Sequence, residues 1–334
     1  MNRTHIEKSI VLLLCIFLAS CSSSEKHPAF IERYQPSLDE IISVTVKRDT
    51  ITTGYDWSEG PVWVASENML LFSDVPKNII YTWTEKDGAK PYLTPSGYTD
   101  TIPRGGEPGS NGLIINKAGE LILSQHGDRK IAAMQSSLSD PKPVFRTLAD
   151  NYNGKKLNSP NDIIQDSQGN YYFTDPPYGM VNPERDSTKE TPFQGVYKIT
   201  TDGKIHLLLD SLTRPNGIAL SPDEKFLYIA NSDPEKAYVY KYEVDGDRVK
   251  SGKVMYDASA LTKSLPGLPD GMKIDAKGNV FATGPGGIFI FSPADELIGK
   301  ILFNDPTSNC AFADDGKTLY ATSDMHIFRI ELRK

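Results

Sequence analysis

Short apolar runs separated by turn residues recur along the chain from about residue 58 to its end. Clear examples lie at residues 121–124, 171–174, 226–230, 280–283 and 319–322. Most of them follow a turn rich in Gly and polar residues, as at residues 117–120 and 167–170. Aliphatic, aromatic and β-branched residues in short runs between turn signals are typical of β-strands. Because no amphipathic helix stands out between residues 59 and 334, the pattern predicts an all-β fold.

The strand pattern is organised as an internal repeat. Six segments begin with a small residue or Pro, continue with an acid or amide, usually followed by Gly, and lead into an apolar stretch. The acid or amide positions are Glu59, Asn111, Asn161, Asn216, Asp270 and Asn309, with spacings of 52, 50, 55, 54 and 39 residues. A period near 50 residues with three or four strands per unit fits the blades of a β-propeller. The repeat therefore predicts a six-bladed β-propeller.

The last unit of the repeat is short, with only three expected strands after Asn309. Residues 42–47 precede the first unit and have the pattern of a spare strand. We expect this N-terminal strand to join the last blade and close the ring, which removes an exposed sheet edge. Two stacked β domains are the alternative, but the period runs on without a linker. Residues 41–334 are thus expected to form a single domain.

The N-terminal twenty residues have the pattern of a targeting signal. Basic residues precede an apolar run at residues 10–19 that is too short for a comfortable membrane span. Leu18-Ala19-Ser20-Cys21 resembles the lipobox of bacterial lipoproteins, which implies cleavage before Cys21 and lipidation of its thiol. Residues 21–40 are then expected to form a tether. The prediction is an exported bacterial lipoprotein, held at the membrane only through Cys21, in the periplasm or at the cell surface; an ordinary signal peptide is the alternative.

Composition and charge exclude two classes of protein. The chain has 36 Lys and Arg against 43 Asp and Glu, a net charge of −7. This balance argues against nucleic acid as a partner, because a phosphate footprint needs clustered Lys and Arg. Three cysteines are too few for a disulfide scaffold. Cys310 has no expected intramolecular partner once the signal segment is removed and Cys21 is acylated.

The six acid or amide positions are expected to meet at one mouth of the propeller channel, because the first strand of each blade lines that channel. The set contains two carboxylates and four amides, with no Lys or Arg. Two acids among carbonyl oxygens repel one another without a cation, and hard divalent cations prefer such oxygen donors. The pattern predicts a divalent metal site. Turn initiation by Asx residues is the alternative, and it explains single positions better than six in register.

These segments carry a resemblance to a known family. Residues 58–63, 214–217 and 269–272 are similar to the three metal-ligand motifs of the senescence marker protein (regucalcin)/gluconolactonase/luciferin-regenerating enzyme family, and residues 125–129, 160–162 and 173–179 to its bacterial gluconolactonase branch. The resemblance covers about residues 40–334 and implies a six-bladed propeller with one catalytic divalent ion. It implies Glu59, Asn216 and Asp270 as ligands, and Asn161 as a ligand or a contact of substrate. Ca²⁺ is expected first, with Zn²⁺ or Mg²⁺ as alternatives.

The resemblance also implies a hydrolase that opens a small-molecule sugar lactone such as glucono-1,5-lactone. A divalent ion can polarise the lactone carbonyl and stabilise the oxyanion that water builds on it. Asp270 is the first candidate for the base that takes the proton of this water. His126 is the second, because the strand before it is expected to end at the same mouth. A loop-packing role is the alternative for His126.

Two further residues, Asn111 and Tyr178, are expected to contact substrate, although Tyr178 could also pack on the prolines of its own loop. Residues 98–109 and 180–193 are candidate rim loops, and Arg104 in the first is expected to be solvated. Ser159 stands where animal members of the family carry Arg, and this difference argues against carrying over their sugar specificity. The alternative functions are a related metal-dependent esterase or phosphotriesterase, and a non-catalytic binding propeller at the cell surface.

Overall fold

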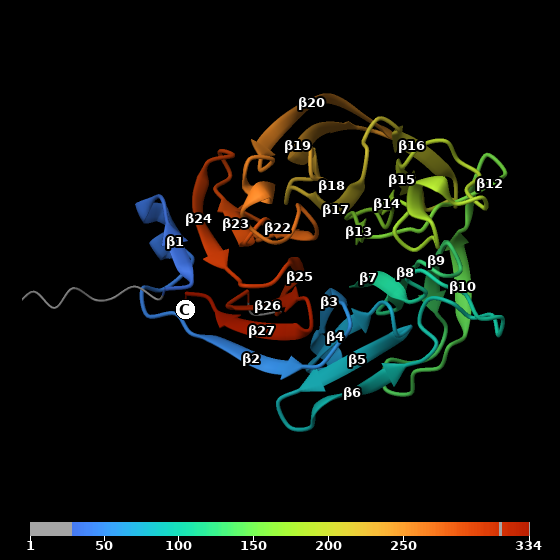
Figure 1. Cartoon of the computed structure of the whole chain (residues 1–334), viewed down its shortest axis with the longest axis horizontal. Coiled ribbons are helices and arrows are strands. Elements are labelled where there is room, and N and C mark those ends of the chain that lie inside the picture. Colours follow the sequence, from blue (N-terminus) through green and yellow to red (C-terminus); the bar gives the residue numbers. More distant parts are fainter. Residues whose placement is uncertain (1–28, 314–315, 334) are drawn as a thin grey trace, which may run out of the picture.

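The computed structural model describes residues 29–313 and 316–333, so the expected signal segment and Cys21 lie outside the described residues. Six sheets are arranged around a central axis, with β3, β7, β13, β17 and β25 nearest the centre (Figure 1). The innermost strand of each blade contacts the innermost strands of both neighbouring blades, which closes the ring. The expected all-β, six-bladed propeller is confirmed.

In each blade the strands are antiparallel neighbours. Blade 1 contains β3 (Ser58–Val64), β4 (Met69–Asp74), β5 (Ile79–Thr84) and β6 (Gly88–Leu93). Blade 2 contains β7 (Ser110–Ile115), β8 (Leu121–Gln125), β9 (Lys130–Met134) and β10 (Phe145–Ala149). Blade 3 contains β13 (Ile163–Gln165), β14 (Tyr171–Asp175), β15 (Gly195–Ile199) and β16 (Ile205–Leu209). The hairpin of β11 (Asn151–Tyr152) and β12 (Lys155–Lys156) lies between blades 2 and 3 in the chain.

The remaining three blades follow the same plan. Blade 4 contains β17 (Pro215–Leu220), β18 (Phe226–Asp233), β19 (Lys236–Asp245) and β20 (Arg248–Asp257). Blade 5 contains β21 (Met272–Ile274), β22 (Val280–Gly284), β23 (Gly287–Phe291) and β24 (Leu297–Leu302). Blade 6 contains β25 (Thr307–Phe312), β26 (Thr318–Ser323) and β27 (His326–Glu331), and is completed by β2 (Arg48–Thr53).

Helical segments of the described residues are short 3₁₀ turns at η1 (Pro36–Glu40), η2 (Ala65–Glu67), η3 (Pro183–Arg185) and η4 (Leu261–Lys263). Among residues 29–313 and 316–333, no helix has the length and apolar character needed to cross a membrane.

An N-terminal strand closes the ring as expected, but its position differs from the prediction. The closing strand is β2, which pairs with β27 from Arg48 opposite Ile330 to Thr53 opposite His326. Residues 42–47 form turns instead. Ile42 and Val46, whose alternation suggested a strand, are buried in the hydrophobic cluster between blades 5 and 6. Alternation in this segment therefore reflects two anchoring side chains of a turn and not a pleated strand.

Part of the expected tether belongs to the folded body. β1 (Ile31–Arg33) pairs antiparallel with β24 and adds a fifth strand to blade 5. The segment η1 follows, and Leu38 within it is buried in the same cluster as Ile31. The Arg33 guanidinium donates to the carbonyl of Ser43 at 2.9 Å. Residues 31–40 are consequently anchored on blade 5, which corrects the expectation of a tether reaching residue 40.

The hydrophobic core is divided among the interfaces between neighbouring blades. In β4, Met69 and Leu71 belong to the cluster shared with blade 2, whereas Leu70 and Phe72 belong to the cluster shared with blade 6. Alternate side chains of a strand point to opposite faces of its sheet. A blade strand is thus covered on both faces, which is why these strands read as continuous apolar runs rather than as alternating ones.

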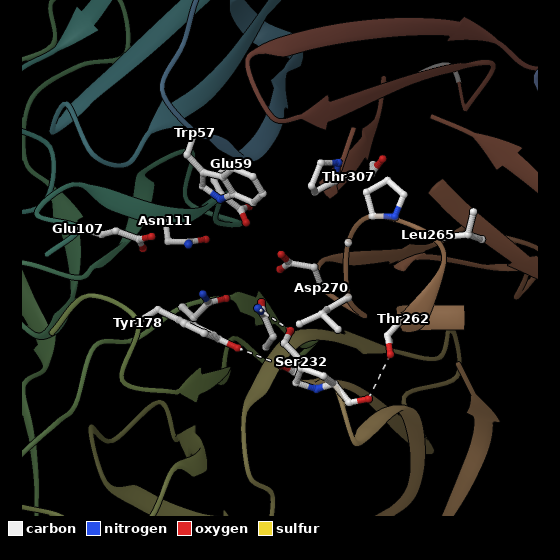
Figure 2. Close-up of a pocket in the computed structure, with 17 residues that line it drawn as sticks. Trp57, Glu59, Glu107, Asn111, Tyr178, Ser232, Thr262, Leu265, Asp270 and Thr307 are labelled. Carbon is white, nitrogen blue, oxygen red and sulfur yellow. Dashed lines mark hydrogen bonds between the residues drawn. The ribbon is translucent and has the colours of Figure 1, made fainter. Parts of the chain in front are cut away.

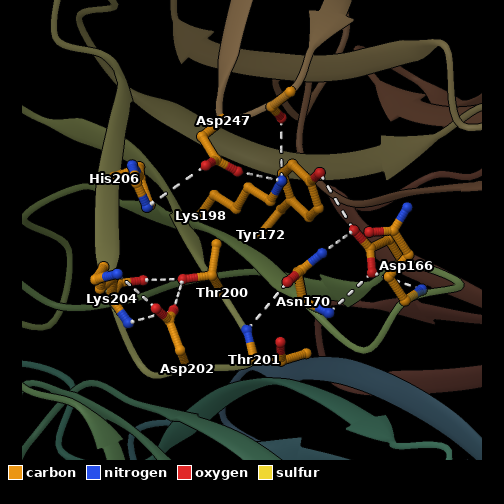
Figure 3. Close-up of polar contacts among 12 residues, drawn as sticks. Asp166, Asn170, Tyr172, Lys198, Thr200, Thr201, Asp202, Lys204, His206 and Asp247 are labelled. Carbon is orange, nitrogen blue, oxygen red and sulfur yellow. Dashed lines mark hydrogen bonds and ion pairs between the residues drawn. The ribbon is translucent and has the colours of Figure 1, made fainter.

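Polar contacts join blade 3 to the turn between β19 and β20 of blade 4 (Figure 3). Lys198 donates to Asp247 at 2.7 Å, and His206 Nε2 lies 3.8 Å from the same carboxylate. Asp166 accepts the backbone N–H groups of Gln168 and Asn170, which fixes the turn between β13 and β14. His206 thus lies on the outer strand of blade 3, beside Asp247.

Candidate active site

A cavity of about 500 Å³ is lined by residues from five of the six ring positions (Figure 2). These are Glu59, Asn111, Asn161, Asn216 and Asp270, and Tyr178 lines the same cavity. The residues come from blades 1 to 5, so positions about 50 residues apart in sequence meet at one place. Trp57 and Leu265 contribute to an apolar part of the wall.

The sixth ring position does not line the cavity. The side-chain Oδ1 of Asn309 accepts hydrogen bonds from Lys273 Nζ at 3.1 Å and from the Cys310 N–H at 2.9 Å. Lys273 lies on the innermost strand β21, and its ammonium group thus binds the side-chain oxygen of Asn309. The ring at the cavity thus has five members instead of the expected six.

A hydroxyl group on the second strand of one blade holds the ring segment of the next blade. Four such bonds run from Ser73 to the Asn111 carbonyl (3.0 Å), from Thr174 to the Asn216 carbonyl (2.6 Å), from Ser232 to the Pro269 carbonyl, and from Thr283 to the Ser308 carbonyl (3.1 Å). Each bond satisfies a buried backbone acceptor, which would otherwise destabilise the fold. Our sequence reasoning missed these residues. Their signal is a Ser or Thr at or near the end of the second strand in successive repeat units.

Close contact between neighbouring blades explains why a Gly follows the acid or amide in the repeat. A Cβ atom on Gly217 would lie 2.0 Å from the carbonyl oxygen of Asp270, and one on Gly60 would lie 2.0 Å from that of Asn111. Gly60 also has a φ of 51°, which favours glycine. The absence of a side chain lets adjacent blades approach until their ring residues share one cavity.

Polar residues at the ends of the second strands hold the loops that lead into the ring. Asp175 accepts the N–H groups of Asn158 and Ser159, both at 2.8 Å, just before Asn161. Asp74 accepts the N–H groups of the two residues that precede β3, at 3.2 and 3.3 Å. Burial raises the pKa of Asp175 to about 7, while these N–H donors and the charge of Arg129 oppose the increase. These carboxylates fix the approach of the chain to Glu59 and Asn161.

Several oxygen atoms at the ring have no hydrogen-bond donor among the described residues. They are the side-chain Oδ1 atoms of Asn111, Asn216 and Asp270, and all are buried. Asn216 Nδ2 donates to Ser232 Oγ at 3.0 Å, which leaves Oδ1 as the end of the amide without a partner. Buried polar atoms without partners are rare in proteins. Carboxylate and amide oxygens are the donors that hard divalent cations prefer, so these residues fit such an ion.

The raised pKa values of the two ring carboxylates also fit a site for a cation. Burial, together with the charges of Asp162 and Glu107, raises the pKa of Glu59 to about 8. Burial and the charge of Glu59 raise the pKa of Asp270. A bound cation reverses this effect, because it stabilises the ionised carboxylates. No cluster of three or more His, Cys, Asp or Glu side chains that could hold a metal occurs among the described residues, since the ring contributes only two acids beside its amides.

His126 does not line the cavity. Its side chain is fully buried, and its Nδ1 lies 3.4 Å from the carboxylate of Glu107, which does line the cavity. A Cβ atom on Gly179 would lie 2.4 Å from that of His126, so the Gly179 turn covers the histidine closely. Glu107 was not singled out by the sequence beyond its place in residues 98–109. The structure therefore brings a carboxylate, not an imidazole, to this part of the wall.

The two candidate rim loops differ in their relation to the cavity. Arg104 donates to the carbonyls of Gly127 (2.7 Å) and Gly179, so it joins three loops and is not simply solvated. No residue of 180–193 lines the cavity. Tyr178 does, and its hydroxyl lies 3.5 Å from the Ser232 carbonyl, with burial raising its pKa.

The fold and the site together define a six-bladed propeller with a buried oxygen-donor ring suited to a divalent cation. The chain matches the SMP-30/gluconolactonase/LRE-like region over residues 57–325. It belongs to this family, which confirms the resemblance seen in the sequence.

Individual relatives agree with the family assignment. A gluconolactonase of Zymomonas mobilis is 40% identical over 311 residues, which cover 91% of this chain and 86% of that protein. A Xanthomonas campestris structure described as a gluconolactonase has a TM-score of 0.77 at 24% identity, covering 91% of this chain and 95% of that one. A calcium-binding regucalcin structure from Agrobacterium tumefaciens has a TM-score of 0.64 at 16% identity, covering 85% and 93%. The two structures establish similarity of fold.

Proposed function

We propose that the protein is a metal-dependent hydrolase that opens a sugar lactone. The observation that carries this proposal is the convergence of unpaired oxygens from Asn216 and Asp270 with the buried Glu59 carboxylate in one cavity. A relative named gluconolactonase that is 40% identical over most of the chain supports the lactone as substrate class. Glu59, Asn161, Asn216 and Asp270 would hold the ion. Ca²⁺ is the first choice because all these donors are hard oxygens, with Zn²⁺ and Mg²⁺ as alternatives.

A divalent cation supplies Lewis acidity toward a carbonyl oxygen and lowers the pKa of water in its neighbourhood. Asp270 is the proposed base, because its carboxylate faces the cavity and Oδ1 has no other partner. Without an ion, burial and the charge of Glu59 raise the pKa of Asp270. A bound cation would lower that pKa and keep the carboxylate ionised, which is the form that accepts a proton. His126 is a weaker candidate since it is shielded from the cavity.

Other residues of the cavity would orient the lactone. The amides of Asn111 and Asn161 offer N–H donors to ring or carbonyl oxygens of a substrate. Tyr178 stays protonated because burial raises its pKa, so its hydroxyl would donate to substrate in place of its 3.5 Å contact with the Ser232 carbonyl. Donors held in fixed positions reduce the entropy that must be lost as the carbonyl and water approach each other.

The test is a hydrolysis screen with Ca²⁺, Zn²⁺ and Mg²⁺ in turn, using glucono-1,5-lactone, other lactones, aryl esters and an organophosphate. We expect lactone hydrolysis that a chelator abolishes and a metal restores. Asp270→Asn should lower kcat by about 10²–10⁴-fold. Asp305→Asn, which removes a carboxylate outside the cavity lining, should have little effect. Hydrolysis of organophosphate alone, or none in any arm, would contradict the lactonase assignment.

We also propose that the protein is an exported lipoprotein, anchored through acylated Cys21. The lipobox-like residues 18–21 support this proposal. Mass spectrometry of the mature N-terminus should find a lipid-modified Cys21. Cys21→Ser should release the protein from the membrane fraction, and an unmodified N-terminus at another residue would contradict the assignment.

A further inference from the structure

We propose that Glu107 is a specificity-determining residue that selects neutral, polyhydroxylated lactones, and that buried His126 is its positioning residue. This inference rests on the proposed lactone hydrolysis and adds the class of lactone. Its basis is the contact between a fully buried imidazole and a carboxylate at the cavity wall.

Glu107 is the third carboxylate of the cavity, beside Glu59 and Asp270. Figure 2 shows it on the same side as Asn111, with its carboxylate directed toward that amide. The Glu107 side chain is 37% exposed and lines the cavity. Glu59 and Asp270 belong to the proposed cation site. Glu107 is thus the carboxylate of the wall that is left for substrate hydroxyl groups.

The pairing with His126 is unusual for an exposed loop residue. The His126 ring is fully buried, and the described residues give neither of its nitrogens a hydrogen bond. Its nearest acidic neighbour is Glu107, with Oε2 at 3.4 Å from Nδ1. Burying an imidazole without hydrogen-bond partners costs free energy. The Glu107 carboxylate is the acidic group within reach of this ring, so we assign His126 the role of orienting it.

The backbone on both sides of Glu107 is held in place. Gly109 donates its N–H to the Val75 carbonyl at 2.9 Å and accepts the His126 N–H at 3.1 Å. Before Glu107, the Arg104 side chain joins the loop to the carbonyls of Gly127 and Gly179. A carboxylate on a loop fixed in this way is preorganised, so little entropy is lost when it binds a hydroxyl group.

The charge of the wall determines which lactones fit. Of the described residues that line the cavity, three are carboxylates and none is Lys, Arg or His. A phosphorylated or carboxylated lactone would bring a negative charge next to Glu107 with no cationic side chain to receive it. Sugar hydroxyl groups instead donate to the carboxylate, and hydrogen bonds to charged acceptors are among the stronger ones. The arrangement therefore favours neutral polyhydroxylated substrates.

The first experiment compares wild type with Glu107→Ala and Glu107→Gln on glucono-1,5-lactone, its 6-phosphate and δ-valerolactone, which has no hydroxyl groups. For Glu107→Ala we expect the ratio of kcat/KM for glucono-1,5-lactone to that for δ-valerolactone to fall by about 10–100-fold, mainly through KM. The discrimination against the 6-phosphate should also weaken in both variants. Asp100→Asn removes a carboxylate from the same loop but outside the cavity, and should leave both ratios unchanged. Equal ratios in wild type and Glu107→Ala would overturn the proposal.

The second experiment tests the role of His126 through Glu107. His126→Asn retains an N–H donor near the position of Nδ1, whereas His126→Leu removes it at similar volume. We expect the leucine variant to lose the preference for the hydroxylated lactone and the asparagine variant to retain most of it. If both variants keep their melting temperature and the same preference, the positioning role is wrong.

A binding measurement separates this inference from the proposed hydrolysis. Gluconolactam, a neutral lactone isostere that resists hydrolysis, is titrated calorimetrically into wild type and Glu107→Ala. Weaker binding to the variant supports the role of Glu107, whether or not any lactone is hydrolysed. A lack of hydrolysis in that case would refute only the hydrolase proposal. Equal binding, or no binding to wild type, would overturn the role of Glu107.

Discussion

The close contact between blades 4 and 5 gives the sharpest test of how the ring is built. Replacing Gly217 by Ala places a Cβ atom 2.0 Å from the carbonyl oxygen of Asp270 and 2.8 Å from the Cα of Gly271. Real Cβ atoms essentially never approach another atom closer than 3.0 Å, so the Asp270 backbone must retreat by about 1 Å. Gly217 is not among the glycines with positive φ, so the effect is steric and not one of backbone strain.

We expect two measurable consequences of Gly217→Ala. Overpacking of a rigid interface costs about 1–3 kcal/mol of unfolding free energy. A shift of about 1 Å in the backbone that bears Asp270 also exceeds the tolerance of about 0.5 Å for a functional site, so metal affinity should fall by at least ~10-fold. Urea unfolding in the presence of chelator measures the first effect. Calorimetric titration with Ca²⁺ measures the second.

Gly105→Ala is the matched control. Gly105 also lacks a positive φ, and the nearest atom to its added Cβ is a Val181 methyl group at 3.5 Å, an ordinary van der Waals contact. This variant should unfold and bind metal like wild type. If Gly217→Ala matches Gly105→Ala in both assays, the reasoning that interblade contact at Gly217 sets the ring is refuted.

Two further predictions concern the residues that support the ring. Thr174→Val removes the hydroxyl that donates to the Asn216 carbonyl at 2.6 Å, and should lower the unfolding free energy by about 1–3 kcal/mol in urea, while Thr201→Val at an exposed turn should not. Asp175 has a folded-state pKa of about 7, above the ~3.9 of an unfolded Asp. Its contribution to the unfolding free energy therefore falls as pH rises from about 4 to 7, and stays constant above pH 7. Asp175→Asn should therefore flatten the decline of unfolding free energy between pH 5 and 7, by up to ~1.4 kcal/mol per pH unit. An unchanged slope would mean that Asp175 is ionised throughout this range.

The parts of the fold that the sequence predicted are those that repeat. Glu59, Asn216 and Asp270 could be placed at one site because each occupies the same position of the repeat, after a Ser or Pro and before a Gly. That pattern has a local steric cause, the contact of each Gly with the next blade. A repeat period near 50 residues then determines the number of blades, and five of the six ring positions meet as expected.

The parts that the sequence could not predict depend on contacts without a repeat. Asn309 follows the pattern, yet Lys273 from the neighbouring blade donates to its side-chain Oδ1. His126 was expected near the mouth, and only the packing of Gly179 against it shows that it lies behind the wall. Glu107 lies in a loop whose course is set by Arg104 and backbone carbonyls, and no motif marks it. The closing strand was predicted at residues 42–47 but lies at Arg48–Thr53. Buried side chains of a turn can show the same apolar alternation as a strand.

The placement of β1 has a mechanical consequence. β1 lies between the N-terminal segment and the closing strand β2, and it is bound to blade 5, while β2 belongs to blade 6. Force applied to the chain before Ala29 is therefore carried first by the three residue pairs that join Ile31–Arg33 to β24, and by the bonds of Arg33. These contacts are not among those that close the ring of six blades. Pulling on the N-terminus, as the proposed lipid anchor would, is expected to detach an accessory strand before any load reaches the ring closure or the cavity.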